Sequence, residues 1–151
     1  MKVTGLDRVI VMVRDMDKAL ELFSGKMGMK FRELDKDVQT KAGNRGYVCH
    51  ETHLHLVQPF DPLPDDAPPP LRKAAEMLKD TEAMIMLMVF KTDDAKKGAQ
   101  ELSDQGLSVL RTWEDDQDYR SVGMANLWEY LFDPKDTMGL PILISSWDKM
   151  G

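Results

Sequence analysis

The chain has 151 residues, of which 42% are hydrophobic, and a formal net charge of −6, so it can bury a core within one compact domain. The chain is acidic and has no stripe rich in Lys and Arg, so it lacks the cationic side chains that bind the phosphates of nucleic acids and anionic membranes. We therefore expect it to bind neither. The single cysteine excludes an internal disulfide, and the start of the chain carries neither an apolar span nor a cleavage signal, so we expect a cytoplasmic protein.

The first part of the sequence predicts the element order β-α-β-β-β. Residues 5–13 are an apolar, β-branched run with the character of a strand. A helix follows, with Asp15 as its N-cap and Gly28 as the residue that ends it in the left-handed conformation. Its apolar side chains recur at helical spacing: Ala19, Leu20, Phe23 and Met27. Further strands are predicted at residues 30–34, 45–49 and 52–57, with a polar loop between the first two.

A proline-rich segment separates this part of the sequence from the next. Six of the eight prolines lie within residues 59–70, and proline lacks the amide donor that a central strand needs. We therefore expect an extended connector over residues 59–70 and a short helix over residues 71–79.

The remaining sequence repeats the order β-α-β-β-β. A strand at residues 83–91 is followed by a helix over residues 92–106, capped by Asp93 or Asp94 and ended by Gly106. Three more strands are predicted at residues 107–113, 125–133 and 140–147. The duplication predicts an α+β domain in three parts: a first module over residues 1–58, a connector with a short helix over residues 59–80, and a second module over residues 81–151.

All three histidines lie in the stretch CHETHLH, residues 49–55, beside the only cysteine. His53 and His55 have the spacing of neighbours on one face of a strand, because side chains alternate along a strand. His50 is assigned to the turn before it. Two imidazoles on one face could bind zinc or iron with a third ligand such as Glu51 or Glu129, or could act as acid and base near neutral pH.

Four stretches carry a family resemblance: GLDRVIVMVRDMDKALELFSGKMGMKF, THLHLVQP, DDAKKGAQELSDQGL and FDPKDTMGLPILI. Through them the sequence resembles the vicinal-oxygen-chelate superfamily, which includes glyoxalase I, methylmalonyl-CoA epimerase, bleomycin-resistance proteins and extradiol dioxygenases. The pattern is nearest to the epimerase and glyoxalase I branches. The resemblance implies two tandem βαβββ modules whose curved mixed sheets enclose a shared cavity, and a homodimer.

The resemblance also implies where a divalent metal would be bound. Metal-dependent members place ligands on the first and last strands of each module, and these positions correspond here to Arg8, His55, Leu87 and Leu143. Arginine is always protonated and leucine has no donor atom, so only His55 can be a ligand. We therefore expect no cofactor and no usual metal site, and extradiol dioxygenase chemistry is disfavoured. His53 and His55 remain the candidate ligands of a relocated metal site.

Strand alternation places Arg8 and Met12 on the face that the resemblance assigns to the cavity. Arg8 would bind an anionic or enolate-like oxygen, and His55 would move a proton next to a carbonyl. His53 or Glu129 would complete the acid–base pair. The candidate substrate-binding residues are Arg8, Met12, Trp128 and Tyr130. A structural ion pair for Arg8 and core packing for the aromatic residues are the alternatives.

These residues favour a lyase or isomerase that transfers protons on a small carbonyl, oxoacid or acyl-thioester substrate without the usual metal. One alternative is a binding protein that sequesters a small molecule, as bleomycin-resistance proteins do. Others are a metalloenzyme that uses His53 and His55, and a catalytically inactive partner subunit. The sequence leaves open whether the protein is an enzyme. Whether it is an enzyme or a binding protein, we expect its partner to be a small molecule.

Overall fold

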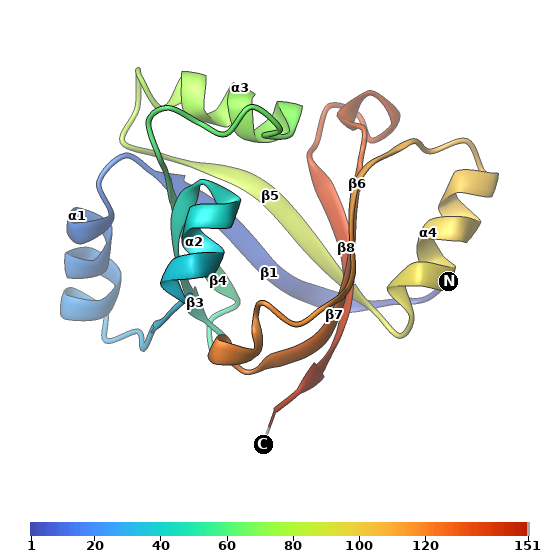
Figure 1. Cartoon of the computed structure of the whole chain (residues 1–151), viewed down its shortest axis with the longest axis horizontal. Helices are drawn as coiled ribbons and strands as arrows, with labels where there is room; N and C mark the ends of the chain where they lie inside the picture. Colours follow the sequence, from blue (N-terminus) through green and yellow to red (C-terminus); the bar gives the residue numbers. More distant parts are fainter. Residues whose placement is uncertain (151) are drawn as a thin grey trace. The chain divides into compact units, whose positions relative to one another are not determined.

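The computed structural model of the protein describes residues 1–150. Its contacts divide the chain into two compact units: the N-terminal unit, Arg8–Met86, and the C-terminal unit, which consists of Met1–Asp7 and Leu87–Gly151. Each unit contains parallel and antiparallel strand pairs with helices packed on them (Figure 1). The α+β class and the two mixed βαβββ modules are confirmed, whereas the module boundaries and the shared cavity stay predictions.

The N-terminal unit has the strand order β2-β3-β4-β1. Its strands are β1 (Val3–Val13), which begins in the C-terminal unit, β2 (Arg32–Glu33), β3 (Asn44–Cys49) and β4 (Leu54–Pro59). β4 runs parallel to β1 and antiparallel to β3, so it is hydrogen-bonded on both sides. One face of this sheet packs against α1 (Met16–Leu20) and the π-helical segment η1 (Glu21–Lys26) that continues it. The core of this contact consists of Val13, Met16 and Leu56.

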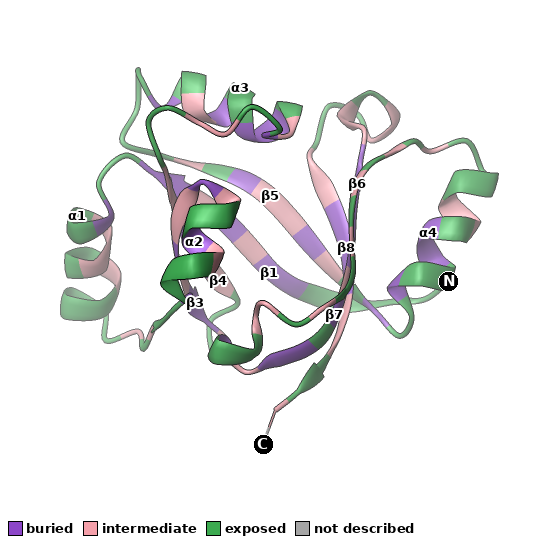
Figure 2. Cartoon of the chain, viewed as in Figure 1, coloured by how far each residue is buried: buried purple, intermediate pink, exposed green. Residues whose placement is uncertain are grey.

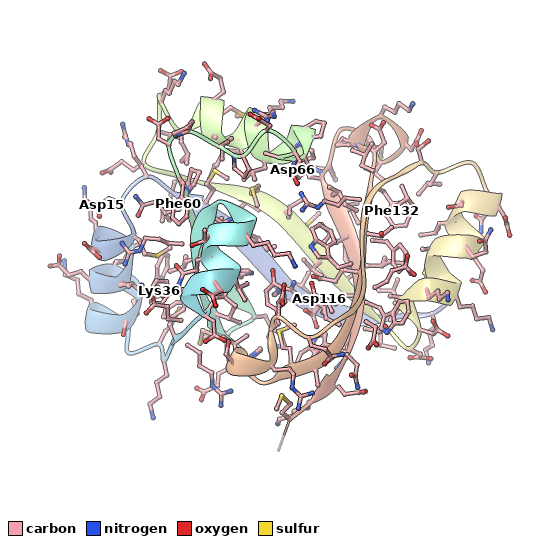
Figure 3. All side chains as sticks on the ribbon, in the orientation of Figure 1. Asp15, Lys36, Phe60, Asp66, Asp116 and Phe132 are labelled. Carbon is pink, nitrogen blue, oxygen red and sulfur yellow. The ribbon has the colours of Figure 1, made fainter. Side chains whose placement is uncertain are left out.

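The first helix begins and ends where the sequence predicts. The side chain of Asp15, labelled in Figure 3, accepts a hydrogen bond from the amide of Lys18 at 3.2 Å, which satisfies a donor that has no partner within the helix. Gly28 follows η1 with a φ of 75°, the left-handed conformation that glycine adopts without steric cost.

The predicted polar loop after β2 contains a helix, α2 (Lys36–Ala42), so the loop prediction was wrong. The only buried residue of α2 is Gln39. Its amide nitrogen donates to the carbonyl of Leu34 at 2.6 Å, and its amide oxygen accepts from the backbone of Gly46 at 3.3 Å. A helix anchored by a hydrogen-bonded polar side chain leaves no apolar periodicity in the sequence.

The proline-rich connector leads into α3 (Pro69–Met77), which begins two residues before the predicted helix. Prolines are tolerated in the first turn of a helix because the amide groups there have no intrahelical partner. Arg72 on α3 donates to backbone carbonyls of the connector, those of Pro64 at 2.8 Å, Asp65 at 2.7 Å and Ala67 at 3.2 Å. One guanidinium thus holds a segment that is poor in amide donors.

Replacing Arg72 by lysine is expected to loosen the connector while the rest of the unit stays folded. Lysine keeps the charge but cannot form the fork of hydrogen bonds. We expect faster amide hydrogen exchange in residues 60–67 and a loss of about 1 kcal/mol in the free energy of unfolding. Lys73→Ala, at an exposed neighbouring position of α3, is the control. Equal exchange rates in the two variants would contradict the role given to Arg72.

The C-terminal unit has the strand order β5-β8-β7-β6. Its elements are β5 (Ala83–Thr92), which begins in the N-terminal unit, α4 (Ala95–Asp104), β6 (Val109–Asp116), η2 (Arg120–Val122), β7 (Met124–Phe132), η3 (Pro134–Asp136) and β8 (Ile142–Lys149). Asp94 caps α4 by accepting from the amide of Lys97 at 3.0 Å, and Gly106 has a φ of 100°, so both predicted helix ends are confirmed.

The helix α4 packs its buried side on β7 and β8, and Figure 2 shows buried and exposed residues alternating around it. The core of this contact consists of Ala95, Ala99, Tyr130, Phe132 and Ile144. Within residues 1–150, no helix is long and apolar enough to cross a membrane.

Candidate functional site

Alternation along β1 separates two sets of side chains in the N-terminal unit. Val11 and Val13 pack on the side of the sheet that carries α1. Arg8, Ile10 and Met12 belong to the other face, and all three are buried, with Arg8 only 3% exposed. A guanidinium is rarely buried to this extent, so Arg8 is the first unusual feature of this face.

His55 lies on the same face as Arg8. It is the direct neighbour of Ile10 in the parallel pair of β1 and β4, and of Val48 in the antiparallel pair of β3 and β4. The side chain is buried, and neither ring nitrogen has a hydrogen-bond partner in the described part of the chain. Buried polar groups in proteins are nearly always hydrogen-bonded, so these two nitrogens are available to a ligand or a water.

The surroundings of His55 keep it uncharged. Burial, then the positive charge of Arg8 and then the effect of His50 lower the pKa of His55 to about 3. At pH 7 the ring is therefore neutral, with one N–H donor and one acceptor nitrogen. The face offers a fixed positive charge beside a neutral ring that can both donate and accept.

Gly46 on β3 has no room for a side chain next to the imidazole, because Leu34 packs against it there. A Cβ built at this position would lie 3.4 Å from Nε2 of His55 and 2.5 Å from Cδ1 of Leu34. Leu34 is itself buried, so its side chain has little room to move away. Sequence reasoning missed this position, because a single glycine in a strand signals only a bulge or a close approach of some kind.

His53 does not share a strand face with His55. β4 begins at Leu54, and His53 has a φ of 58° and an exposed side chain. Its amide donates to the carbonyl of His50 at 3.3 Å, and its carbonyl accepts from the amide of Val9 at 2.8 Å, so it belongs to the turn. The prediction of two imidazoles on one strand face is therefore wrong, since the alternation starts only after His53. The geometric basis for a metal site at these two histidines is lost with it.

The pairing registers identify equivalent positions in the two modules. His55 pairs with Ile10 in the N-terminal unit, and Leu143 pairs with Val89 in the C-terminal unit, in both cases between the parallel last and first strands. The first-strand position that the resemblance assigns to a metal ligand lies two residues before this pair in each module. The equivalent pairs are Arg8 with Leu87, and His55 with Leu143.

These residues do not fit the divalent metal that the resemblance implies. Only His55 has a lone pair to offer, because a guanidinium and two leucine side chains cannot coordinate a cation. Among the described residues, no group of three or more His, Cys, Asp or Glu side chains is placed to hold a metal ion. The expected lack of a cofactor stays a prediction.

The remaining candidates lie in the C-terminal unit, on two different faces. Glu129 on β7 is buried and pairs with Ser145 on β8, so these two side chains project from the same side of the sheet. Trp128 and Tyr130 alternate with Glu129 and pack on the side of α4, where the hydroxyl of Tyr130 donates to Glu114 at 3.3 Å. This corrects the prediction that Trp128 and Tyr130 line a site together with Glu129, because adjacent strand residues point in opposite directions.

Comparison with known proteins gives one consistent result. The profile described as "Glyoxalase/Bleomycin resistance protein/Dioxygenase superfamily" matches residues 5–140, and no curated protein sequence matches the chain. The structure is similar to methylmalonyl-CoA epimerase from Mycobacterium tuberculosis, with a TM-score of 0.69 and 22% identity over 95% of this chain and 87% of that one. A Streptomyces coelicolor methylmalonyl-CoA epimerase variant in complex with 2-nitronate-propionyl-CoA has a TM-score of 0.69 and 17% identity over 95% of this chain and 97% of that one. A hypothetical protein from Bacillus halodurans has a TM-score of 0.68 and 13% identity over 97% of this chain and 96% of that one. At such identities the structural likeness concerns the fold.

Proposed function

The chain belongs to the glyoxalase/bleomycin resistance protein/dioxygenase superfamily, and from this premise we propose that it is a lyase or isomerase that transfers a proton on a small carbonyl, oxoacid or acyl-thioester substrate. One fold hosts many reactions, so the proposal depends on particular side chains. The observation that carries it is the buried pair of Arg8 and His55, a fixed positive charge next to an imidazole with two unpaired nitrogens.

In this proposal, Arg8 holds the substrate oxygen that becomes negative. A guanidinium is not deprotonated in proteins, and it can donate two parallel hydrogen bonds to an enolate or carboxylate. A fixed charge that faces the developing oxyanion stabilises the transition state more than the ground state. Arg8 can supply this stabilisation from within the protein.

His55 accepts the proton in this proposal and returns it. The proton leaves the carbon next to the carbonyl for the unprotonated ring nitrogen, the electron pair of the C–H bond forms a C=C bond, and the π pair of the carbonyl moves onto its oxygen. The low pKa of His55 makes the imidazolium unfavourable unless negative charge forms beside it. An anionic substrate group at Arg8 offsets one cause of that low pKa, so we expect the bound substrate to raise the basicity of His55.

Four further expectations belong to this proposal. Glu129, in the C-terminal unit, stays the candidate for a second acid–base group. The protein is proposed to work without a metal, as a homodimer in the cytoplasm. Metal analysis of protein purified without added metal tests the absence of metal, and near-stoichiometric metal would overturn the role given to Arg8. Light scattering of the protein as it elutes from a size-exclusion column tests the homodimer.

Exchange of the acidic substrate proton with D2O tests the proposed reaction. The protein is incubated with a panel of 2-oxoacids and acyl thioesters, and loss of the proton signal is followed by NMR. We expect His55→Gln and Arg8→Lys to slow the exchange at least about 100-fold. The first variant loses the proton acceptor, and the second loses the guanidinium that donates two parallel hydrogen bonds. His53→Gln is the matched control, since His53 is exposed on the turn.

An equally large loss in the His53→Gln variant would contradict the assignment of the reaction to Arg8 and His55. A second outcome would favour a different function. If no compound exchanges its proton but some of them raise the melting temperature of the protein, the chain sequesters a small molecule without catalysis.

A further inference from the structure

The side chain of Leu34 lies beside the imidazole of His55 in the N-terminal unit. His55 pairs directly with Val48 on β3, yet its Nε2 lies 3.4 Å from the position of a Cβ at Gly46, two residues along the same strand. The ring therefore reaches diagonally across β3. Cδ1 of Leu34 lies 2.5 Å from the same position, and Leu34 is only 3% exposed. An apolar methyl group thus borders the space next to Nε2.

The backbone of Leu34 is fastened to β3 at two points. Its amide donates to the carbonyl of Gly46 at 3.0 Å. Its carbonyl accepts at 2.6 Å from the side-chain amide of Gln39, whose oxygen accepts from the amide of Gly46 at 3.3 Å. Gln39 is buried and also donates to the carboxylate of Glu33 at 3.1 Å. Leu34 therefore cannot withdraw from the imidazole without breaking buried hydrogen bonds, which costs free energy.

We propose that Leu34 selects substrates by the size of the group on the carbon that loses the proton, and that only a small group fits. The inference rests on the proposed function and assigns the proton acceptor to Nε2, the ring nitrogen farther from the backbone of His55. The reacting carbon must come within about 3.5 Å of that nitrogen. A branched substituent on this carbon then overlaps with the methyl group of Leu34, and a packed interior yields little. The favoured substrates are 2-oxoacids and acyl thioesters whose acidic carbon carries at most one methyl group.

Pyruvate and 4-methyl-2-oxopentanoate test the inference, because the acidic carbon carries only hydrogen in the first and an isopropyl group in the second. Binding of each compound to the whole protein is measured by NMR titration, and proton exchange with D2O is followed in the same samples. We expect the wild-type protein to favour pyruvate in both measurements. Leu34→Ala opens a cavity beside the imidazole. This variant should shift the ratio of the two dissociation constants at least about tenfold towards the larger compound.

Leu56→Ala is the matched control. Leu56 is as deeply buried as Leu34 and follows His55 on β4, but it packs on the side of the sheet that carries α1. Its truncation should lower the melting temperature to a similar extent and leave the space at Nε2 unchanged. Leu34→Val removes less of the side chain, so it keeps the test open if the alanine variant does not fold. It should shift the ratio in the same direction by a smaller factor.

Three results would overturn the inference: an unchanged ratio in the folded Leu34 variants, an equal shift in Leu56→Ala, and a wild-type protein that does not favour pyruvate. The two measurements also separate this inference from the proposed function. If the size preference and its shift appear in binding while neither compound exchanges its proton, the proposed reaction fails and size selection beside His55 stands. If both compounds exchange their protons at rates that do not depend on Leu34, size selection fails and the proposed reaction stands.

Discussion

Replacing Gly43 by alanine is expected to lower the free energy of unfolding by about 3 kcal/mol or more, through backbone strain and overpacking together. Gly43 ends α2 with a φ of 77°, and a Cβ there would lie 2.4 Å from Cδ and 2.5 Å from Cγ of Pro64. The proline ring is rigid, and Arg72 binds the carbonyl of Pro64 at 2.8 Å. The carbonyl of Gly43 also accepts from the amide of Phe60, labelled in Figure 3, at 2.7 Å. The connector therefore cannot move away without losing these bonds.

Gly28→Ala is the matched control for this prediction, measured in parallel by urea denaturation. Gly28 has almost the same φ, 75°, but no atom lies within 4 Å of the Cβ that alanine would add. This variant reports the left-handed strain alone, for which we expect a loss of about 1 kcal/mol. Equal losses in the two variants would show that the contact between Gly43 and Pro64 contributes nothing to stability.

Replacing His55 by leucine is expected to remove a large part of the acid sensitivity of the protein. In the unfolded chain the imidazole titrates near pH 6.5, whereas in the folded protein its pKa is about 3. Below pH 6.5 the unfolded state therefore binds a proton that the native state does not, so stability falls as the pH falls towards 3. This difference amounts to about 3 kcal/mol of unfolding free energy between pH 7 and pH 4, which the variant should retain.

Urea denaturation at pH 7 and at pH 4 measures this effect, with His53→Gln as the control at an exposed histidine. All other titrating groups are shared, so the difference between the proteins isolates position 55. Leucine occupies the equivalent position 143 of the second module, and the variant loses two unpaired nitrogens, so we expect no loss of stability at pH 7. The same pH dependence in His55→Leu and in the wild-type protein would refute the low pKa of His55.

Local features of the sequence were sufficient to predict the order of the strands and the residues that begin and end the first helix and α4. Asp15 and Asp94 act on amides three residues away, and Gly28 and Gly106 adopt a conformation that depends only on their own lack of a side chain. Period-two alternation likewise put Arg8 on the face away from α1, and the duplicated pattern predicted both modules. These properties depend on neighbours in the sequence, so they can be predicted without a structure.

The composition of the candidate site was decided by the tertiary structure. His53 does not lie beside His55 because the turn holds its backbone through hydrogen bonds to His50 and Val9. Trp128 and Tyr130 do not lie on the face of Glu129 because they pack on the side of the sheet that carries α4. Whether a polar side chain is buried and unpaired depends on strands that are distant in the sequence. The sequence determined that His55 and Ser145 are present, but only the pairing of β4 with β1 and of β8 with β7 buried them without partners.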